Sequence, residues 1–195
     1  MGKHEDIQHS ILVVSSSEKF DDALKKAIPM NRVMSLEFKR SSSSARRALL
    51  ERYIDIVIIN MPLTDEAGFE LAMDVVEKST ASVLILAPAK EYDDVNGKLT
   101  DLGVLVVSKP LPVSMIKQSI KFLMANQLKL HRLEVKLEKS KEKYEELRIV
   151  SRAKILLVEH KSMTEDEAHH YIEKQAMDNG TSKKRIAENI IEDYE

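Results

Sequence analysis

The sequence contains no cysteine and no long apolar run. The lack of cysteine excludes disulfides, iron–sulfur clusters and thiol nucleophiles, and it fits the reducing environment of the cytoplasm. No stretch approaches the length that a membrane-spanning helix needs, and the first ten residues lack the apolar core of a secretion signal. We therefore expect a cytoplasmic protein without a membrane partner.

An excess of charge of one sign is also lacking. The 195 residues carry 30 Lys and Arg against 32 Asp and Glu, a formal net charge of −2. Residues 1–112 carry 14 basic against 17 acidic side chains, and residues 113–195 carry 16 against 15. This balance excludes a protein-wide field that attracts nucleic acid or membranes, so a nucleic-acid site must be a local patch.

Short apolar runs alternate with helical patterns in the first 110 residues. The runs cover residues 11–14, 33–38, 54–59, 83–86 and 104–107, and helical patterns lie near 18–28, 43–52, 66–78 and 91–101. This alternation predicts an α/β domain over residues 1–112, a five-stranded, doubly wound parallel sheet. Its crevice lies at the carboxyl ends of the strands. The residues expected there are Ser15, Ser16, Asn60, Ala87 and Lys109.

Residues 112 to about 159 contain no glycine and, after Pro112, no proline, which predicts one long helix. At 1.5 Å per residue, roughly 45 residues span about 65–70 Å, too long for one small domain to cover. Apolar residues recur in it at spacings of three and four, with Ser or Asn at some positions of the same register. We call the following residues the heptad seam: Leu123, Asn126, Leu130, Leu133, Leu137, Tyr144 and Leu147.

The heptad seam requires an apolar partner, and the simplest partner is a second copy of the chain. We therefore expect residues 113–147 to form a coiled-coil dimerisation helix whose start also serves as the last helix of the first domain. The alternatives are a lone charged helix and a helix that folds back on its own chain.

The remaining residues, 148–195, predict a small module of three helices. Thr164 and Glu167 have the spacing of a capping box, Asn179 and Gly180 end that helix, and Thr181 or Ser182 caps the last one. Lys183, Lys184 and Arg185, in the first turn of the last helix, oppose the helix dipole, which indicates either a polyanion site or a solvated surface turn. The basic residues considered for such a site are Arg148, Arg152, Lys154, Lys174, Lys183, Lys184 and Arg185.

Residues 9–125 resemble the receiver domains of two-component response regulators. The resemblance is carried by ILVV-SSSE, by DIVIIN with MPL and the later G-F-E-L-A, and by VVSKP. It implies the receiver, or flavodoxin-like, fold, but a working receiver has acidic residues at the positions of Ser15 and Ser16, a phosphate-accepting Asp at Asn60 and a hydroxyl at Ala87. Hydroxyls hold Mg²⁺ poorly and a carboxamide is not a nucleophile, so we expect a pseudo-receiver that is not phosphorylated. Only Lys109 remains, hydrogen-bonded to Asn60 or a backbone carbonyl, or else forming a residual anion site.

The last 50 residues resemble the ANTAR domain, an RNA-binding module of antitermination regulators such as the amidase, nitrate and ethanolamine regulators. The matching runs are R-x-V-x-x-A-K, T-E-D-E-A, Y-I-E-K-Q-A-M-D and S-K-K-R-I-A-E-x-I-I, with Ile155 in place of the family's glycine. The resemblance implies a dimer that binds stem-loops in nascent mRNA leaders and so prevents a terminator from forming. The candidate RNA-binding residues are then Arg148, Arg152, Ala153, Lys154, Lys174, Ser182, Lys183, Lys184 and Arg185. Five of them sit at positions of the family motif: Ala153, Lys154, Lys174, Ser182 and Lys184. Tyr171 is the one aromatic placed to stack on a base, although its helical spacing favours the core.

The sequence therefore predicts a non-enzymatic, dimeric RNA-binding antitermination regulator with no cofactor and no metal, controlled in one hypothesis by a protein partner. The alternative is a dimeric protein-interaction scaffold of two-component origin that does not bind RNA. DNA binding is a third possibility, but no helix pair presents a base-reading face at suitable spacing. An enzyme is disfavoured because the crevice lacks reactive groups.

Overall fold

The computed structural model of the chain describes residues 8–194 and shows two compact units, residues 1–131 and 132–195. The N-terminal segment discussed above falls mostly within residues 1–7, outside the described part. Within residues 8–194, no helix is both long and apolar enough to cross a membrane. The expected boundary at residue 112 lies inside the first unit, because the long helix begins as part of that unit's core.

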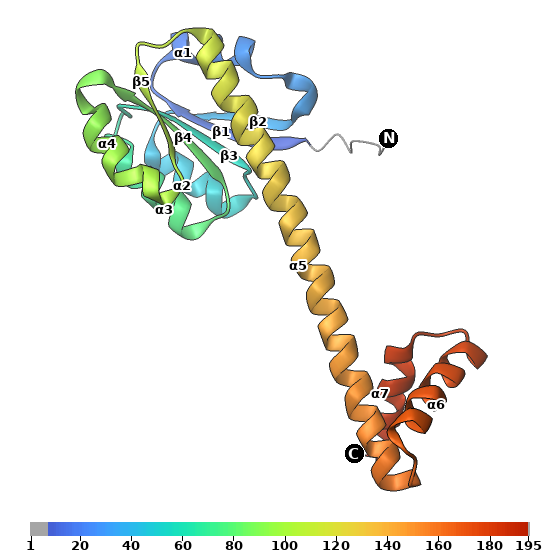
Figure 1. Ribbon diagram of the computed structural model, residues 1–195. Helices are drawn as coiled ribbons and strands as arrows, with labels where there is room; N and C mark the ends of the chain where they lie inside the picture. The colour runs from blue at the N-terminus through green and yellow to red at the C-terminus, as the bar shows by residue number, and fades with distance from the viewer. Residues whose placement is uncertain (1–7, 195) are drawn as a thin grey trace. The chain divides into compact units, whose positions relative to one another are not determined.

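The first unit is built on a parallel sheet in the order β2-β1-β3-β4-β5 (Figure 1). Each strand pairs in parallel with its neighbour, and the strand order places β3 at the centre, between β1 and β4. The predicted fold class is confirmed, because the apolar runs form all five strands. Their bounds are β1 His9–Ser15, β2 Val33–Lys39, β3 Ile56–Asn60, β4 Ser82–Pro88 and β5 Leu105–Lys109.

Helices cover both faces of this sheet, as continuous Val, Ile and Leu runs require. The α1 helix and the start of α5 pack on one face, and α2, α3 and α4 pack on the other (Figure 1). The α-helical bounds are α1 Glu18–Ala27, α2 Ser42–Glu51, α3 Phe69–Lys78, α4 Tyr92–Leu99 and α5 Val113–Lys161, with short 3₁₀ turns η1 Met30–Arg32, η2 Ala89–Glu91 and η3 Thr100–Leu102.

The α5 helix is one uninterrupted helix of 49 residues. In its first turns Ile116, Ile120, Leu123 and Met124 are buried in the core of the first unit. Gln127, also buried, donates its Nε2 protons to the carbonyl of Thr80 at 2.9 Å and to Ser82 Oγ at 3.1 Å. The start of α5 is therefore anchored to the sheet by packing and by two hydrogen bonds.

Leu123 is the one apolar member of the heptad seam that is buried within its own domain. It is 2% exposed in the single chain, because the sheet of its own domain covers it. The later apolar members are exposed, from 41% at Leu130 to 71% at Tyr144. The exposed part of the heptad seam therefore begins after Leu123.

The second unit contains the end of α5 together with α6 Glu165–Asp178 and α7 Lys183–Tyr194. Thr164 and Glu167 form the expected capping box at the start of α6. The core is small and consists of nine buried side chains from the three helices: Ala153, Leu156, Leu157, Ala168, Ile172, Ala176, Ile186, Ala187 and Ile190.

Candidate functional site

The crevice at the carboxyl ends of β1 and β3 is filled by a hydrogen-bonded chain of neutral groups and one lysine. Asn60, which is buried at the end of β3, donates from Nδ2 to Ser15 Oγ over 3.0 Å. Lys109 donates from Nζ to Asn60 Oδ1 over 2.9 Å and also to the carbonyl of Met61. Both partners expected for Lys109 are thus present, and burial lowers the pKa of its ammonium, with Glu91 opposing that shift.

The other predicted residues of the crevice add no carboxylate to these hydrogen-bonded groups. Ser15 Oγ also accepts from the backbone N–H of Ser17 at 3.1 Å, while the exposed Ser16 donates its hydroxyl to the carbonyl of Pro62. Ala87 is fully buried in the core and offers no hydroxyl. The five predicted crevice residues therefore supply hydroxyls, an amide and an ammonium, a set that favours neither Mg²⁺ binding nor phosphoryl transfer.

Asp65 is the first acidic residue after β3, and its carboxylate has a structural role. Its carboxylate accepts hydrogen bonds from the backbone N–H and hydroxyl groups of both Ser42 and Ser43, at 2.8–3.0 Å. These bonds, led by the backbone N–H of Ser43, hold the pKa of Asp65 well below its ordinary range. Asp65 therefore caps the N-terminus of α2.

An arginine that the sequence gave no reason to select lies beside the crevice. Arg40 donates from Nη1 to the carbonyl of Ser15 at 2.9 Å and also to the carboxylate of Asp21, which is buried. The pair joins the end of β2 to α1 across 19 residues of sequence. No periodic pattern links such positions, so only the folded chain brings them together.

In the second unit, two of the proposed RNA-binding residues, Ala153 and Ser182, have roles in the fold itself. Ala153 is fully buried between the three helices, so its side chain does not reach a ligand at the surface. Ser182 accepts the backbone N–H of Arg185 on its Oγ at 3.2 Å, which makes it the cap of α7. Tyr171 packs against the core, as its spacing favours, with Lys161 Nζ 5.0 Å from its ring centroid.

The basic side chains of this unit are partly or fully exposed, and most face a carboxylate. Lys154 donates to Glu165 at 2.7 Å, and this bond lowers the pKa of Glu165. Lys174 is exposed on α6. The remaining contacts are those of Arg148 with Glu145 at 2.7 Å, of Lys183 with Glu173, and of Lys184 and Arg185 with Glu188 at 4.0 and 3.7 Å. Because surface ion pairs contribute little to stability, a phosphate group can compete with these carboxylates.

The histidines of this unit are held by other side chains. His169 and His170 lie 3.3 and 3.6 Å from the carboxylate of Glu173, and His160 stacks on Tyr194 with ring centroids 4.9 Å apart. Over residues 8–194, no three or more His, Asp or Glu side chains come close enough to hold a metal ion.

Comparisons with known proteins agree with both halves of this description. The model of the ANTAR domain matches residues 138–191. The transcriptional regulatory protein PdtaR of Mycobacterium tuberculosis is 29% identical over 139 residues, which are 71% of this chain and 67% of that protein.

Solved receiver domains share the fold of the first unit. The signal receiver domain of an HD domain-containing protein from Pseudomonas fluorescens has a TM-score of 0.57 at 20% identity, over 64% of this chain and 93% of its own. The receiver domain of a putative LuxO repressor protein from Vibrio parahaemolyticus has a TM-score of 0.58 at 17% identity, over 65% and 97%. The chain therefore contains an ANTAR domain at residues 138–191, and its first unit has the receiver fold.

Proposed function

We propose that this protein is a transcription antitermination regulator that acts in the cytoplasm as a dimer and binds stem-loops in nascent mRNA. The observation that carries the proposal is the ANTAR match over residues 138–191, on a folded three-helix module whose basic side chains lie at its surface. Unpaired loop bases and phosphates are the parts of an RNA hairpin that such side chains can contact.

The start of α7 is the part of the module that best fits a phosphate. Lys183, Lys184 and Arg185 occupy its first turn, where the positive end of the helix dipole disfavours cations. The nearby carboxylates of Glu173 and Glu188 offset this cost in the free protein. A phosphate at the helix N-terminus would meet both the lysines and the backbone N–H groups, which explains basic residues at this end.

Dimerisation is assigned to the exposed part of the heptad seam. Leu130, Leu133, Leu137, Tyr144 and Leu147 are each 41–71% exposed in the single chain. A row of large apolar side chains at heptad spacing is stabilised when a second helix covers it. Two copies would then present two RNA-binding modules, which suits a pair of adjacent stem-loops.

The crevice supports a receiver that is not phosphorylated. Asn60 replaces the acceptor carboxylate, its amide is engaged with Ser15 and Lys109, and the crevice residues offer no carboxylate for Mg²⁺. Regulation then falls to an effector other than a phosphoryl group, such as a protein partner that docks on the receiver-like domain.

One observation favours the alternative, a dimeric scaffold that binds proteins and not RNA. Residues 148–195 contain 8 Lys and Arg against 10 Asp and Glu, a net charge of −2, and the basic side chains described above mostly face carboxylates. Long-range attraction of RNA is therefore weak, and binding depends on local contacts.

The two functions are separated by RNA binding at varied salt. Crosslinking in cells followed by RNA sequencing identifies a two-hairpin RNA, which is then titrated with the purified protein. Antitermination predicts that binding weakens as salt rises, and that Lys154→Ala and Lys184→Ala each lower the slope of log affinity against log salt by about 0.7–0.9. Lys117→Ala, the same change at an exposed lysine of the receiver-like domain, is the control. Binding that is absent at low ionic strength supports the scaffold.

A further inference from the structure

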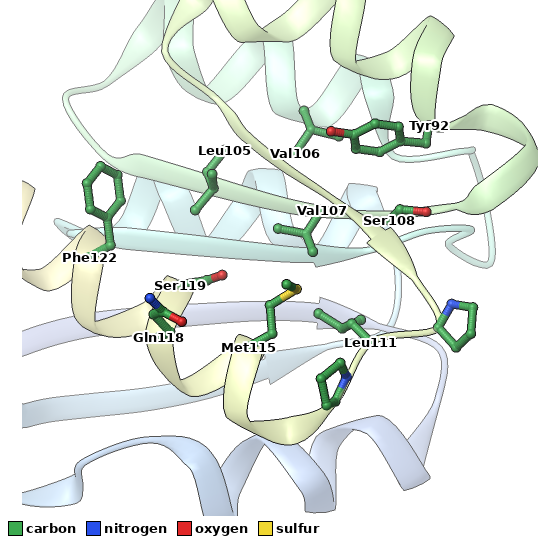
Figure 2. A pocket seen from close by; sticks show the side chains of 12 residues that line it. Tyr92, Leu105, Val106, Val107, Ser108, Leu111, Met115, Gln118, Ser119 and Phe122 are labelled. Atoms are coloured by element: carbon green, nitrogen blue, oxygen red, sulfur yellow. The ribbon is translucent and has the colours of Figure 1, made fainter.

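Grooves of different construction open on the receiver-like domain. One lies between β5 and the start of α5, has a volume of about 860 Å³, and shows Val107 of the edge strand β5 facing Met115 across it (Figure 2). Another lies between the C-terminal ends of α2 and α3, where the interior strands β3 and β4 begin, and we call it the α2–α3 groove. An extended peptide that adds to a sheet needs an edge strand, so the α2–α3 groove can select a partner only by side-chain contacts.

The α2–α3 groove has an apolar wall that reaches solvent. It consists of adjacent hollows of about 540 and 240 Å³, which share Leu49, Leu50, Lys78 and Ser79 in their lining. Leu50 is 88% exposed, the highest fraction among the large apolar side chains of residues 8–194. Tyr53, which lines the larger hollow, is 64% exposed. An exposed aliphatic and an exposed aromatic side chain beside such hollows suit an apolar anchor of a partner protein.

The helix on one side of the groove is basic. Residues 40–53, which contain α2, have four arginines against one acidic residue, Glu51, although the domain as a whole is acidic. Arg47 is exposed and precedes Leu50 by three residues, so the two lie on the same side of the helix. Arg52, which lines the larger hollow, is also exposed, with Glu37 3.3 Å away. Carboxylates of a partner would therefore meet complementary charge next to the apolar wall.

The opposite side of the groove is closer to neutral. Asp74 of α3 accepts from Arg46 at 2.8 Å and pairs with Lys78, so these three side chains of the lining largely balance one another. The unbalanced charge is thus positive and lies on the α2 side. This asymmetry would fix the orientation of an acidic partner in the groove.

Hydrogen bonds join the α2–α3 groove to the long helix. The hydroxyls of Tyr53 and Thr80, both in the lining, are 3.2 Å apart and share a hydrogen bond. The backbone carbonyl of the same Thr80 accepts from Gln127 of α5. A partner that contacts Tyr53 therefore reaches the start of α5 through one residue.

We propose that the α2–α3 groove binds an acidic amphipathic helix of a regulatory protein. An apolar side chain of that helix packs against Leu50 and Tyr53, and its carboxylates face Arg47 and Arg52. The inference rests on the proposed regulation by a protein partner and names the surface and the chemistry of that partner. RNA is a less suitable ligand for this groove, because Leu50, at its centre, offers neither a stacking face nor a hydrogen-bond donor.

Peptide binding to the full chain tests the proposal. The probe is a fluorescent peptide of about 20 residues of Glu, Ala and Leu, with leucines at spacings of three and four so that they form one helical face. One control peptide has Lys in place of every Glu, and another has the same composition with the leucines dispersed around the helix. In anisotropy titrations, the acidic amphipathic peptide should bind at least about tenfold more tightly than either control.

Variants of the chain locate the binding site. Leu50→Glu and Arg47→Glu should each weaken binding of the acidic peptide at least about tenfold, as loss of an interface anchor does. Leu102→Glu and Lys90→Glu make the same changes at exposed residues away from the groove, and they should leave binding unchanged. Circular dichroism checks that each variant is folded. The proposal is overturned if the acidic peptide does not bind at up to about 1 mM, or if the two groove variants bind it like the unmodified chain.

Two further measurements on the same samples keep this proposal separate from the proposed function. Leu50→Glu should bind a two-hairpin RNA and dimerise like the unmodified chain. If it loses either property, the groove serves RNA or a second copy, and the groove proposal is overturned. If the unmodified chain binds the acidic peptide but no RNA, the groove proposal stands and the proposed function fails.

Hydrogen exchange tests the connection to α5. The bound peptide should slow amide exchange at residues 79–82 and at the start of α5. In Gln127→Leu, the peptide should still bind and slow exchange at residues 79–82, but its effect on α5 should be lost, because the hydrogen bond to Thr80 is missing. A peptide that slows exchange at residues 79–82 alone in the unmodified chain contradicts this connection.

Discussion

Ala153 and Lys154 are adjacent in α5, but they have opposite surroundings. Ala153 is fully buried among the three helices of the ANTAR domain, whereas Lys154 reaches the surface and pairs with Glu165. In Ala153→Leu, the three added carbons enter a filled core, and overpacking of this kind costs about 1–3 kcal/mol. At 1.4 kcal/mol for each factor of ten, amide hydrogen exchange through unfolding of this domain should become roughly 5- to 150-fold faster.

Lys154→Ala should have the converse effect. Exchange in residues 148–194 should stay near that of the unmodified chain, because a surface ion pair contributes little to stability. RNA affinity should fall, with a salt slope lower by about 0.7–0.9 for one lost phosphate contact. Hydrogen exchange by mass spectrometry and fluorescence anisotropy titrations with a two-hairpin RNA measure both quantities on the full chain.

The control for the larger side chain is Ala125→Leu, at an exposed alanine earlier in α5. It should change neither exchange in residues 148–194 nor RNA affinity. The reasoning is refuted if Ala153→Leu leaves exchange unchanged and still abolishes RNA binding, since Ala153 would then contact the RNA itself.

Three further predictions concern the receiver-like domain. Asn60→Asp should take up no label from radioactive acetyl phosphate, because the predicted crevice residues offer no further carboxylates for Mg²⁺. Adding Ser15→Asp and Ser16→Asp to this variant should restore uptake. Labelling of the single variant contradicts this. Burial lowers the pKa of His9 below its ordinary 6.5. Below pH 6.5 the unfolded chain binds more protons at this histidine than the folded chain does, so the free energy of unfolding should fall as pH drops, by at most about 1.4 kcal/mol per pH unit from this group. In urea titrations, His9→Gln should lessen this fall. An unchanged pH profile contradicts the prediction. Gln127→Leu removes two buried hydrogen bonds and should lower the stability of the domain by about 1–3 kcal/mol, measured as faster amide hydrogen exchange at the start of α5. Gln118→Leu, the same change at an exposed glutamine, should leave this exchange unchanged. Equal exchange in the two variants argues against Gln127 as an anchor.

The sequence predicted the strands, the long helix and the capping box because each depends on local pattern. Continuous runs such as those ending at Asn60 mark buried parallel strands, and the spacing of Thr164 and Glu167 marks a helix start. The crevice residues were predicted from their place after the strands. The hydrogen bond from Lys109 to Asn60 was among the expected contacts, whereas the bond from Asn60 to Ser15 became visible only in the fold.

The misplaced part of the heptad seam has a geometric reason. Leu123, Leu130 and Leu137 of the heptad seam are spaced by exact sevens, and Ile116, outside the seam as defined above, lies seven residues before Leu123. A straight α-helix drifts about 20° per heptad. Over the three heptads from Ile116 to Leu137 this drift adds up to about 60°. Ile116 and Leu123 are buried in the core of their own domain, whereas Leu130 and Leu137 are exposed. A seven-residue repeat alone does not distinguish these two faces.

Contacts between residues distant in sequence could not be predicted from local patterns. Asp65 caps a helix 22 residues earlier, and Arg40 pairs with Asp21 without any shared pattern. The burial of Ala153 follows from helical spacing once α6 and α7 are docked. Its place in a family motif does not show whether it binds RNA or fills the core.

The central claim is that two copies of the chain bind one folded transcript. Analytical ultracentrifugation of the full chain with a two-hairpin RNA at low ionic strength tests it most directly. We predict a complex of two protein chains with one RNA, which dissociates as salt is raised and is lost in Lys184→Ala with Lys154→Ala. A protein that sediments as a single chain and leaves every stem-loop RNA free at low salt would contradict the account.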